Sequence, residues 1–365
     1  TFVQSGATAA LSTGVTQTGW AIPAQDGIEL EKDEAPTDLY AACPYCGVGC
    51  GTILKTRNGR ITGIVPDKDH PTNKGLQCIK GLTSAEAIYV NRLNKPLIRK
   101  DMSDPLKGHV SATKGSYDPS LFREASWEEA EELVADKIVE IVKASGGNAV
   151  GLYGSGQLSL EGQYLENIFM KGIIGSNTIE ANARMCMTSA VTGYFKALGS
   201  DTPPTCYEDV ELADMICFWG HNARGAHPIL YWRVADSKAQ RNIPTLVVDP
   251  RRTGTVMGLE DVNKDNSFHF PTINGDISIH NALAYALMEN HDDAIAWDFL
   301  KEYTTGWQEY VDAVQAGYKP EDVEDRTKIP AAEIRKVAAI WAKASIRGRE
   351  RGTGGVMCIW GIGYN

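Results

Sequence analysis

Four cysteines near the start of the chain limit its possible folds more than any other residues. Cys43, Cys46 and Cys50 stand in C-P-Y-C-G-V-G-C and Cys78 follows in Q-C-I-K-G, a C-x2-C-x3-C-x27-C spacing. Thiolates from one glycine-rich loop and a fourth from further along can surround a cubane, because glycine lets the backbone turn tightly. The spacing predicts a [4Fe-4S] cluster and an electron-transfer protein. The alternative is a structural zinc site, but such sites usually show two C-x2-C pairs, and the second is missing.

Composition excludes two classes of protein. The chain has 365 residues, of which 43% are hydrophobic, so it can bury a sizeable core and form two or three domains. A formal net charge of −10 argues against a nucleic-acid surface, which needs clustered Lys and Arg. The one basic run, Arg347 to Arg351, is predicted to be a solvated loop. Since no apolar stretch approaches the roughly 18 residues of a membrane span, an integral membrane protein is not expected.

Residues 1–35 are predicted to be a leader. Thr1-Phe2-Val3-Gln4 and the small, apolar residues from Ser5 to Val15 are typical of a twin-arginine export signal downstream of its arginine pair. Small residues from Ala21 to Ala24 suggest a processing site. The alternative is a disordered or surface-draped segment, since no arginine pair is present.

Residues 36–97 are predicted to form the cluster domain and residues 98–365 an α/β region. Asn58-Gly59 lies between two β-type runs from Thr52 to Val65, which predicts a hairpin. Residues 98–125 are expected to be a linker. A helix is predicted after the Ser126/Glu129 capping box, with an apolar stripe that packs on a sheet. That stripe consists of Trp127, Ala130, Leu133, Val134, Ile138, Ile141 and Val142.

Buried strands are predicted at 149–153, 215–219 and 245–248, each followed by a loop and a helical segment. This order predicts a mostly parallel, doubly wound α/β sheet, whose strand ends carry ligands. The loops are Gly154 to Gln157, Trp219 to Asn222 and Asp249 to Thr253. Their small and polar residues suit a pyrophosphate or a guanine edge. None is a G-x-G-x-x-G or Walker loop, so an ordinary nicotinamide or ATP site is not indicated.

Four further cysteines lie outside the cluster motif. Cys217 and Cys358 stand in apolar, strand-like runs and are predicted to be core residues, and Cys206 is given the same interpretation. Cys186 stands in N-A-R-M-C-M-T-S-A, at an apparent loop-to-helix junction where backbone amides and Arg184 favour a thiolate. A metal ligand and a buried structural cysteine both remain open for Cys186 on this chemistry.

From about residue 40 to residue 365 the chain resembles molybdopterin oxidoreductases of the dimethyl sulfoxide reductase superfamily, above all periplasmic and assimilatory nitrate reductases. The motifs that carry the resemblance, in order, are C-P-Y-C-G-V-G-C, Q-C-I-K-G, Y-G-S-G-Q, N-A-R-M-C-M-T-S-A-V-T-G-Y, C-Y-E-D-V-E-L-A-D, W-G-H-N-A-R-G-A-H-P-I-L, V-V-D-P-R-R-T and I-W-G-I-G-Y-N. The resemblance implies a [4Fe-4S] cluster and a molybdenum held by two molybdopterin guanine dinucleotides.

The resemblance also implies roles for individual residues. Cys43, Cys46, Cys50 and Cys78 become the cluster ligands, Cys186 the molybdenum ligand, and Lys80 a link between cluster and pterin by hydrogen bonding. Positions that match cofactor contacts are Gln157, Asn182, Trp219, Gly220, His221, Asn222 and the rest of the segment to Ala226, Asp249, Arg251, Thr253, Asn274, Gly275, Asp276 and Ile362. His227 and Pro228 are predicted only to pack at a helix start.

The implied reaction is reduction of nitrate to nitrite, with electrons entering at the cluster and passing through the pterin to molybdenum. Formate-oxidising members usually carry His directly after the metal ligand, whereas Met187 stands there, and an apolar side chain suits an oxyanion funnel better than proton removal. Met187 as plain pocket lining, a formate dehydrogenase or another oxyanion reductase, and a non-catalytic electron-relay subunit remain alternatives.

Members of the family are typically about twice as long, in line with several domains of ordinary size. A fragment, or a second chain that completes the site, is therefore expected. The resemblance further implies an electron-donor protein such as a cytochrome or ferredoxin as partner. It implies a periplasmic location, or a cytoplasmic one for an assimilatory enzyme.

Overall fold

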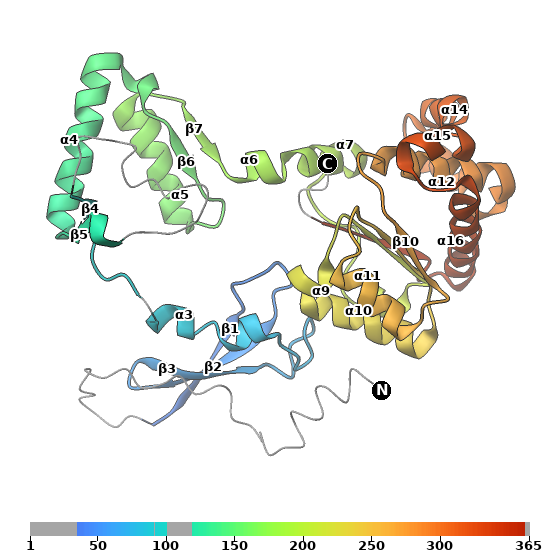
Figure 1. The fold of residues 1–365 in the computed structure, drawn as a ribbon, viewed down its shortest axis with the longest axis horizontal. Coiled ribbons are helices and arrows are strands. Elements are labelled where there is room, and N and C mark those ends of the chain that lie inside the picture. Colours follow the sequence, from blue (N-terminus) through green and yellow to red (C-terminus); the bar gives the residue numbers. More distant parts are fainter. Residues whose placement is uncertain (1–34, 91, 101–118, 362–365) are drawn as a thin grey trace. The chain divides into compact units, whose positions relative to one another are not determined.

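The structure is a computed structural model that describes residues 35–90, 92–100 and 119–361 (Figure 1). The predicted leader therefore lies outside the described residues. The chain divides into two compact units. The larger unit joins Thr1–Glu86 to Ala190–Asn365, and the middle unit is Ala87–Ser189.

The larger unit begins with an antiparallel sheet of β1 (Thr37–Ala42), β2 (Gly51–Arg57) and β3 (Arg60–Pro66). The predicted hairpin is confirmed: Asn58 and Gly59 form its two-residue turn with φ of 52° and 70°. Both angles are the left-handed ones that a type I′ turn requires. The short helices α2 (Ile79–Leu82) and α3 (Glu86–Tyr89) follow.

The main sheet consists of four parallel strands in the order β10-β9-β8-β11. They are β8 (Met215–Trp219), β9 (Thr245–Val248), β10 (Ser267–Phe270) and β11 (Val356–Trp360). The strands predicted at 215–219 and 245–248 are confirmed, and every residue of both is buried. Continuous apolar runs of this kind are typical of parallel strands that are covered on both faces.

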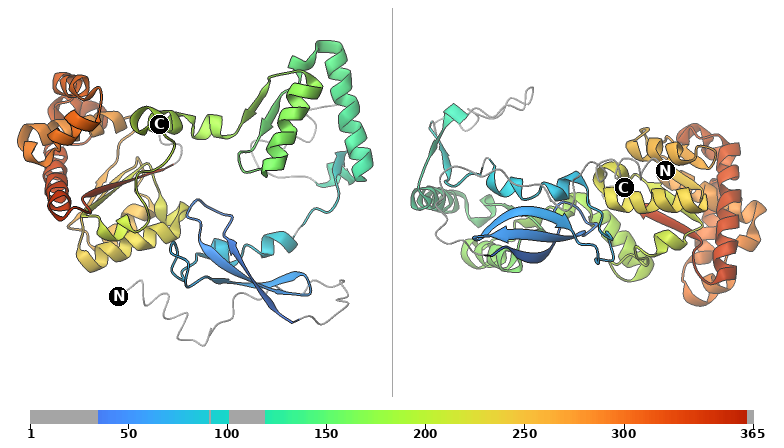
Figure 2. Two further views of the ribbon diagram at one scale, coloured as in Figure 1. Left: turned by 180° about the vertical axis from the view of Figure 1, so that it is seen from behind. Right: turned by 90° about the horizontal axis from the view of Figure 1, so that it is seen from below.

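Helices cover both faces of the main sheet (Figures 1 and 2). Met215, Cys217 and Trp219 pack with α12 (Asp276–Asn290), α15 (Pro320–Thr327) and α16 (Ala331–Arg351). The alternate residues Ile216 and Phe218 pack on the other face. That face carries α8 (Asp209–Leu212), α9 (Ala223–Ala226), α10 (Pro228–Arg241) and α11 (Gly254–Val262). The prediction of an α/β fold with a parallel sheet is thereby confirmed. Between α12 and α15 lie η4 (Asp292–Ala294), α13 (Trp297–Tyr303) and α14 (Trp307–Gly317).

The sequence predicted that the basic run Arg347 to Arg351 is a solvated loop, and this was wrong. The run forms the last turn of α16. The helix ends at Gly352, whose φ of 74° is left-handed. Arg351 Nη2 lies 2.7 Å from Asp214 Oδ2, which also accepts a hydrogen bond from Gly355 N. These contacts tie the end of α16 to the start of β8.

The middle unit contains two small sheets. β4 (Leu97–Arg99) pairs antiparallel with β5 (Phe122–Glu124), and β6 (Leu152–Gly154) pairs parallel with β7 (Ile179–Ala181). The expected linker therefore has strands at both ends, with η1 (Pro119–Leu121) before β5; residues 101–118 lie outside the description. The strand predicted from Ala149 is shorter, because η2 (Gly147–Ala149) precedes it, and Tyr153 is 63% exposed rather than buried.

The helix predicted after Ser126 is α4 (Trp127–Ser145), and Ser126 Oγ accepts a hydrogen bond from Glu129 N at 3.1 Å. No residue of this fully described helix is buried and Trp127 is 63% exposed, so its apolar stripe is covered only in part. The unit continues with α5 (Leu160–Asn167), η3 (Ile168–Ile174), α6 (Ala183–Cys186) and the first residues of α7 (Thr188–Leu198).

Candidate cofactor site

The four cysteines of the first motif come together in the larger unit. Cys43, Cys46 and Cys50 lie between β1 and β2, and Cys78 is the residue that precedes α2. Cys43 N donates to Cys50 O at 2.9 Å, which closes the loop. Gly49 has a φ of 70°, so the tight turn requires glycine at this position.

The cysteine loop is electrostatically costly without a cation. Burial, and to a lesser extent the neighbouring thiols of Cys43, Cys46 and Cys78, raise the pKa of Cys50 to about 12. A [4Fe-4S] cluster needs thiolates, and its iron ions would supply the positive charge that the loop lacks.

The described thiols are not placed as the ligands of a single zinc ion. Within the part of the chain that the structure describes, no three His, Cys, Asp or Glu side chains are placed to hold a single metal ion. Four ligands of zinc would converge on one point at about 2.3 Å. A cubane instead places several iron and sulfide ions between its four cysteines, so neighbouring but separate thiols are what it requires.

A buried asparagine that the sequence analysis did not single out holds the two cysteine segments together. Asn73 is 1% exposed, and its Oδ1 accepts from Gly51 N at 2.8 Å. Its Nδ2 donates to Gly51 O at 3.1 Å and to Leu76 O at 2.8 Å. Because Gly51 follows Cys50 and Leu76 precedes Cys78, this side chain sets the spacing between the third and fourth thiols.

We expect Asn73→Ala to lower both cluster occupancy and stability. The change removes three buried hydrogen bonds, each worth about 0.5–1.5 kcal/mol, and leaves their backbone partners without substitutes. A loss of about 2–4 kcal/mol in the free energy of unfolding follows. Denaturant unfolding and iron per chain measure the two effects, and Cys46→Ser sets the level of complete cluster loss. Full iron content with unchanged stability in Asn73→Ala would contradict this role.

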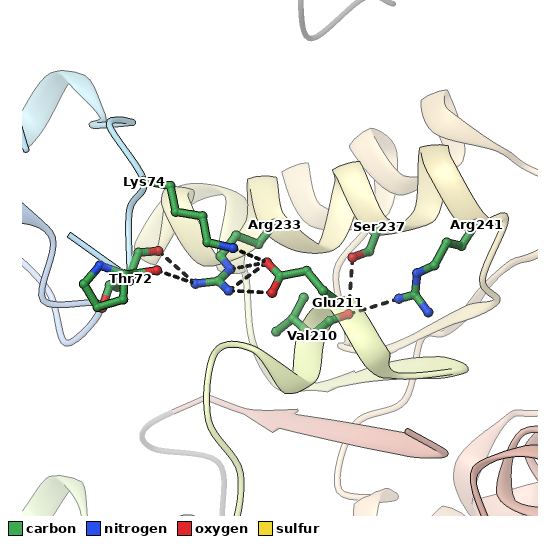
Figure 3. A network of polar contacts seen from close by, with 8 residues as sticks. Thr72, Lys74, Val210, Glu211, Arg233, Ser237 and Arg241 are labelled. Carbon is green, nitrogen blue, oxygen red and sulfur yellow. Dashed lines mark hydrogen bonds and ion pairs between the residues drawn. The ribbon is translucent and has the colours of Figure 1, made fainter. Parts of the chain in front are cut away.

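The cluster segment is attached to the main sheet through Arg233 of α10 (Figure 3). Arg233 is 7% exposed and pairs with both carboxylate oxygens of Glu211, at 2.8 and 2.7 Å. Its Nη1 donates to Pro71 O and Thr72 O. A bidentate pair of this kind fixes direction as well as distance. The loop that carries Asn73 is therefore oriented by a helix of the α/β layer.

Lys80 reaches the segment that was predicted to contact the pterin. Its Nζ donates to Gly225 O at 3.1 Å and lies 3.5 Å from Ala226 O. Burial lowers the pKa of His227, and the charge of Lys80 lowers it further. Since Lys80 follows Cys78 by two residues, its side chain bridges the cysteine segment and helix α9, which follows strand β8.

Three of the predicted cofactor loops share one edge of the main sheet. They follow β8, β9 and β10, and neighbouring parallel strands end on the same side. Thr255 Oγ1 donates to Asn222 Oδ1 at 3.1 Å, and Arg251 N donates to Asp249 Oδ1 at 2.9 Å. Asn274, before Gly275 and Asp276 at the start of α12, has a φ of 56°.

Several buried polar atoms at this edge make no hydrogen bond within the described chain. Thr253 Oγ1, Thr272 Oγ1 and His221 Nδ1 are buried with no hydrogen-bond partner among the described residues. Burial and the neighbouring His227 lower the pKa of His221 to about 4, so its ring is neutral near pH 7. His221 Nε2 and His227 Nδ1 lie 2.7 Å apart and share one hydrogen. Unpaired buried polar groups are costly, and a polar ligand such as a dinucleotide would satisfy them.

The remaining predicted contacts belong to the middle unit. Gly156 N donates to Asn182 Oδ1 at 2.9 Å, so the loop of Gln157 and Asn182 meet at the carboxyl ends of β6 and β7. Cys186 is the last residue of α6, and the half-buried Met187 follows it. Arg184 lies 3.5 Å from Glu180 and so shares its charge with that carboxylate. Ile362 lies outside the described residues.

The core predictions for the other three cysteines have mixed outcomes. Cys217 is fully buried and Cys358 partly buried, as expected for core residues. Cys206 is exposed, so its interpretation as a core residue was wrong. It precedes α8, where its N–H donates to Asp209 Oδ2 at 2.8 Å.

The chain belongs to the molybdopterin oxidoreductase family. The model of that family matches residues 92–349, and the molybdopterin oxidoreductase Fe4S4 domain matches residues 39–90. A [4Fe-4S] cluster and a molybdopterin are therefore the cofactors of this chain, which agrees with the cysteine loop and with the polar edge of the sheet.

Similar proteins include three nitrate reductases. The nitrate reductase of Symbiobacterium thermophilum is 33% identical over 98% of this chain and 44% of its own length. The periplasmic nitrate reductase of Campylobacter fetus is 34% identical over 84% of this chain and 32% of its own. The nitrate reductase of Synechocystis is 30% identical over 88% of this chain and 42% of its own length. The chain thus spans less than half the length of each.

Acetylene hydratase from Pelobacter acetylenicus has a similar fold. It superposes with a TM-score of 0.65 over 88% of this chain and 40% of its own, at 19% identity. None of the helices in the described ranges is long and apolar enough to cross a membrane.

Proposed function

We propose that this chain is the cofactor-binding part of a molybdenum nitrate reductase, which converts nitrate, two protons and two electrons into nitrite and water. The observation that carries the proposal is the identity of 30–34% to three proteins named nitrate reductase. Met187, directly after Cys186, supports the same substrate, because an apolar neighbour has no proton chemistry to offer formate.

The residues have distinct roles in this proposal. Cys43, Cys46, Cys50 and Cys78 hold the cluster, and Cys186 ligates molybdenum, which is held by two molybdopterin guanine dinucleotides and supplies the oxygen-transfer chemistry when bound. Lys80 joins the cluster segment to the sheet edge through its bond to Gly225 O. The loops after β8, β9 and β10 hold one dinucleotide, and the unsatisfied hydroxyls of Thr253 and Thr272 donate to it.

The domain boundaries predicted from the sequence fit these roles: a leader at 1–35, a cluster domain at 36–97 and a pterin-binding region at 98–365. The family match at 39–90 supports the second. Export to the periplasm and an electron-donor protein remain part of the proposal. The relative from Campylobacter fetus, which is named periplasmic, supports that location.

The test is an assay of the purified full-length protein with metal analysis. With reduced viologen as electron donor, we expect nitrite to form from nitrate and no electron transfer from formate to the oxidised dye. We expect one molybdenum and four irons per chain, the content that a single cluster and one metal centre require. Formate oxidation without nitrate reduction would replace the proposal by a formate dehydrogenase. A protein that contains iron but no molybdenum would instead be an electron-relay subunit, which would contradict the proposal.

A further inference from the structure

Two cysteines that the proposed function does not use stand opposite each other in the main sheet. Cys217 of β8 is the register partner of Cys358 of β11, and both are free thiols. Neighbouring strands lie about 4.8 Å apart. That spacing falls within the Cα–Cα range of about 4.4–6.8 Å in which disulfides form.

The two side chains also point to the same face of the sheet. Cys217 belongs to the apolar cluster that β8 forms with α12 and α16, and Cys358 packs against that cluster. Cys217 has no exposed surface, whereas Cys358 is only partly buried. Cys358 is therefore the more exposed of the two thiols.

The environment makes the two thiols chemically unequal. A hydrogen bond from Cys217 lowers the pKa of Cys358 against the effect of burial, and a hydrogen bond from Trp219 acts in the same direction. Burial raises the pKa of Cys217, and the nearby Cys358 adds to this. Cys358 is thus the more acidic thiol of the pair and Cys217 the less acidic one. A more acidic and more exposed thiol beside a buried partner thiol is the arrangement that thiol–disulfide exchange needs.

We propose that Cys217 and Cys358 form a redox-active dithiol that small disulfides convert into an intramolecular disulfide. In the first step the Cys358 thiolate attacks a small disulfide RSSR, forms a mixed disulfide and releases RS⁻. In the second step Cys217 gives up its proton, attacks Sγ of Cys358 and releases RS⁻, which takes up that proton as RSH. The pair loses two electrons and the proton of Cys217, and RSSR is reduced to RS⁻ and RSH.

The disulfide would act on the edge of the sheet that faces the cofactor loops. Two residues beyond the pair, Trp219 and Trp360 stack with His280 of α12. The ring centroids of Trp219 and His280 lie 3.6 Å apart and those of His280 and Trp360 lie 5.0 Å apart. Gly361 N then donates to Trp219 O at 3.0 Å. A covalent link between β8 and β11 therefore fixes the strands directly beneath this stack.

The test is a peptide map of the full-length holoprotein after incubation with oxidised glutathione. The protein is then quenched in acid, alkylated under denaturing conditions and digested without reductant. We expect the peptides of Cys217 and Cys358 to be joined, with a mass two hydrogens below their sum, in a fraction that rises with the ratio of oxidised to reduced glutathione. The exposed Cys206 is the internal control and should carry glutathione instead.

Two variants test the order of attack. In Cys217→Ser we expect the glutathione adduct to remain on Cys358, because no second thiol resolves it. In Cys358→Ser we expect Cys217 to stay unmodified while Cys206 reacts as before. Recovery of both cysteines as free thiols in the wild type, under conditions that modify Cys206, would overturn the proposal without reference to any variant. An adduct on Cys217 in Cys358→Ser would overturn the assigned roles.

Discussion

Cys186→Ala is expected to keep the [4Fe-4S] cluster and to lose nitrate reduction. The cluster ligands lie in the larger unit and Cys186 in the middle unit, so the change alters none of the four cluster thiols. Alanine has the highest helix propensity, and it preserves the end of α6 while removing the thiol that the proposal assigns to molybdenum. The reducible cluster signal in electron paramagnetic resonance and the rate of nitrite formation measure the two outcomes.

Cys206→Ala is the matched control for Cys186→Ala. It removes a thiol near the short helix α8, outside every proposed ligand set. We expect it to retain both the cluster signal and turnover. Undiminished nitrate reduction by Cys186→Ala with viologen as donor would show that another residue, or none, ligates the metal.

Sequence patterns predicted the parts of the fold that depend on local chemistry. Asn58-Gly59 fixes a hairpin because both residues accept left-handed angles, and the structure has those angles. The runs of β8 and β9 are short and continuously apolar, which is typical of strands in a parallel sheet that is covered on both faces. The cysteine spacing likewise identified the thiols that meet in one loop, because the ligands of a cluster follow fixed spacings.

Features that depend on tertiary contacts escaped prediction. The run Arg347 to Arg351 has the composition of a loop, but the ion pair with Asp214 continues the helix to its end. The sequence around Asn73 resembles any turn, and only its burial shows that the side chain joins two segments. The apolar stripe of α4 predicted the helix correctly. Such a stripe does not say which surface covers it or how completely, and no residue of α4 is buried.

Lys80→Met is expected to keep both cofactors and to slow turnover strongly. Methionine retains the length and the apolar stem of lysine but loses the hydrogen bonds that Nζ donates to Gly225 O and Ala226 O. Hydrogen bonds to a charged group contribute about 1.5–3 kcal/mol, so their loss from the proposed electron path corresponds to a reduction of about 10- to 100-fold. Viologen-dependent nitrite formation, together with iron and molybdenum content, provides the measurement.

The companion variant Lys80→Arg separates electron transfer from assembly. Arginine keeps the positive charge and the donors in a different geometry, so we expect it to restore part of the activity lost in Lys80→Met. Lys55→Met is the matched control, because Lys55 lies in β2 of the same segment and pairs only with the exposed Asp38 in the described contacts. If Lys80→Met has wild-type turnover and full metal content, Lys80 has only a structural role. Loss of molybdenum from that variant would instead assign Lys80 to cofactor binding, since its bonds to Gly225 and Ala226 then hold the segment that the cofactor contacts.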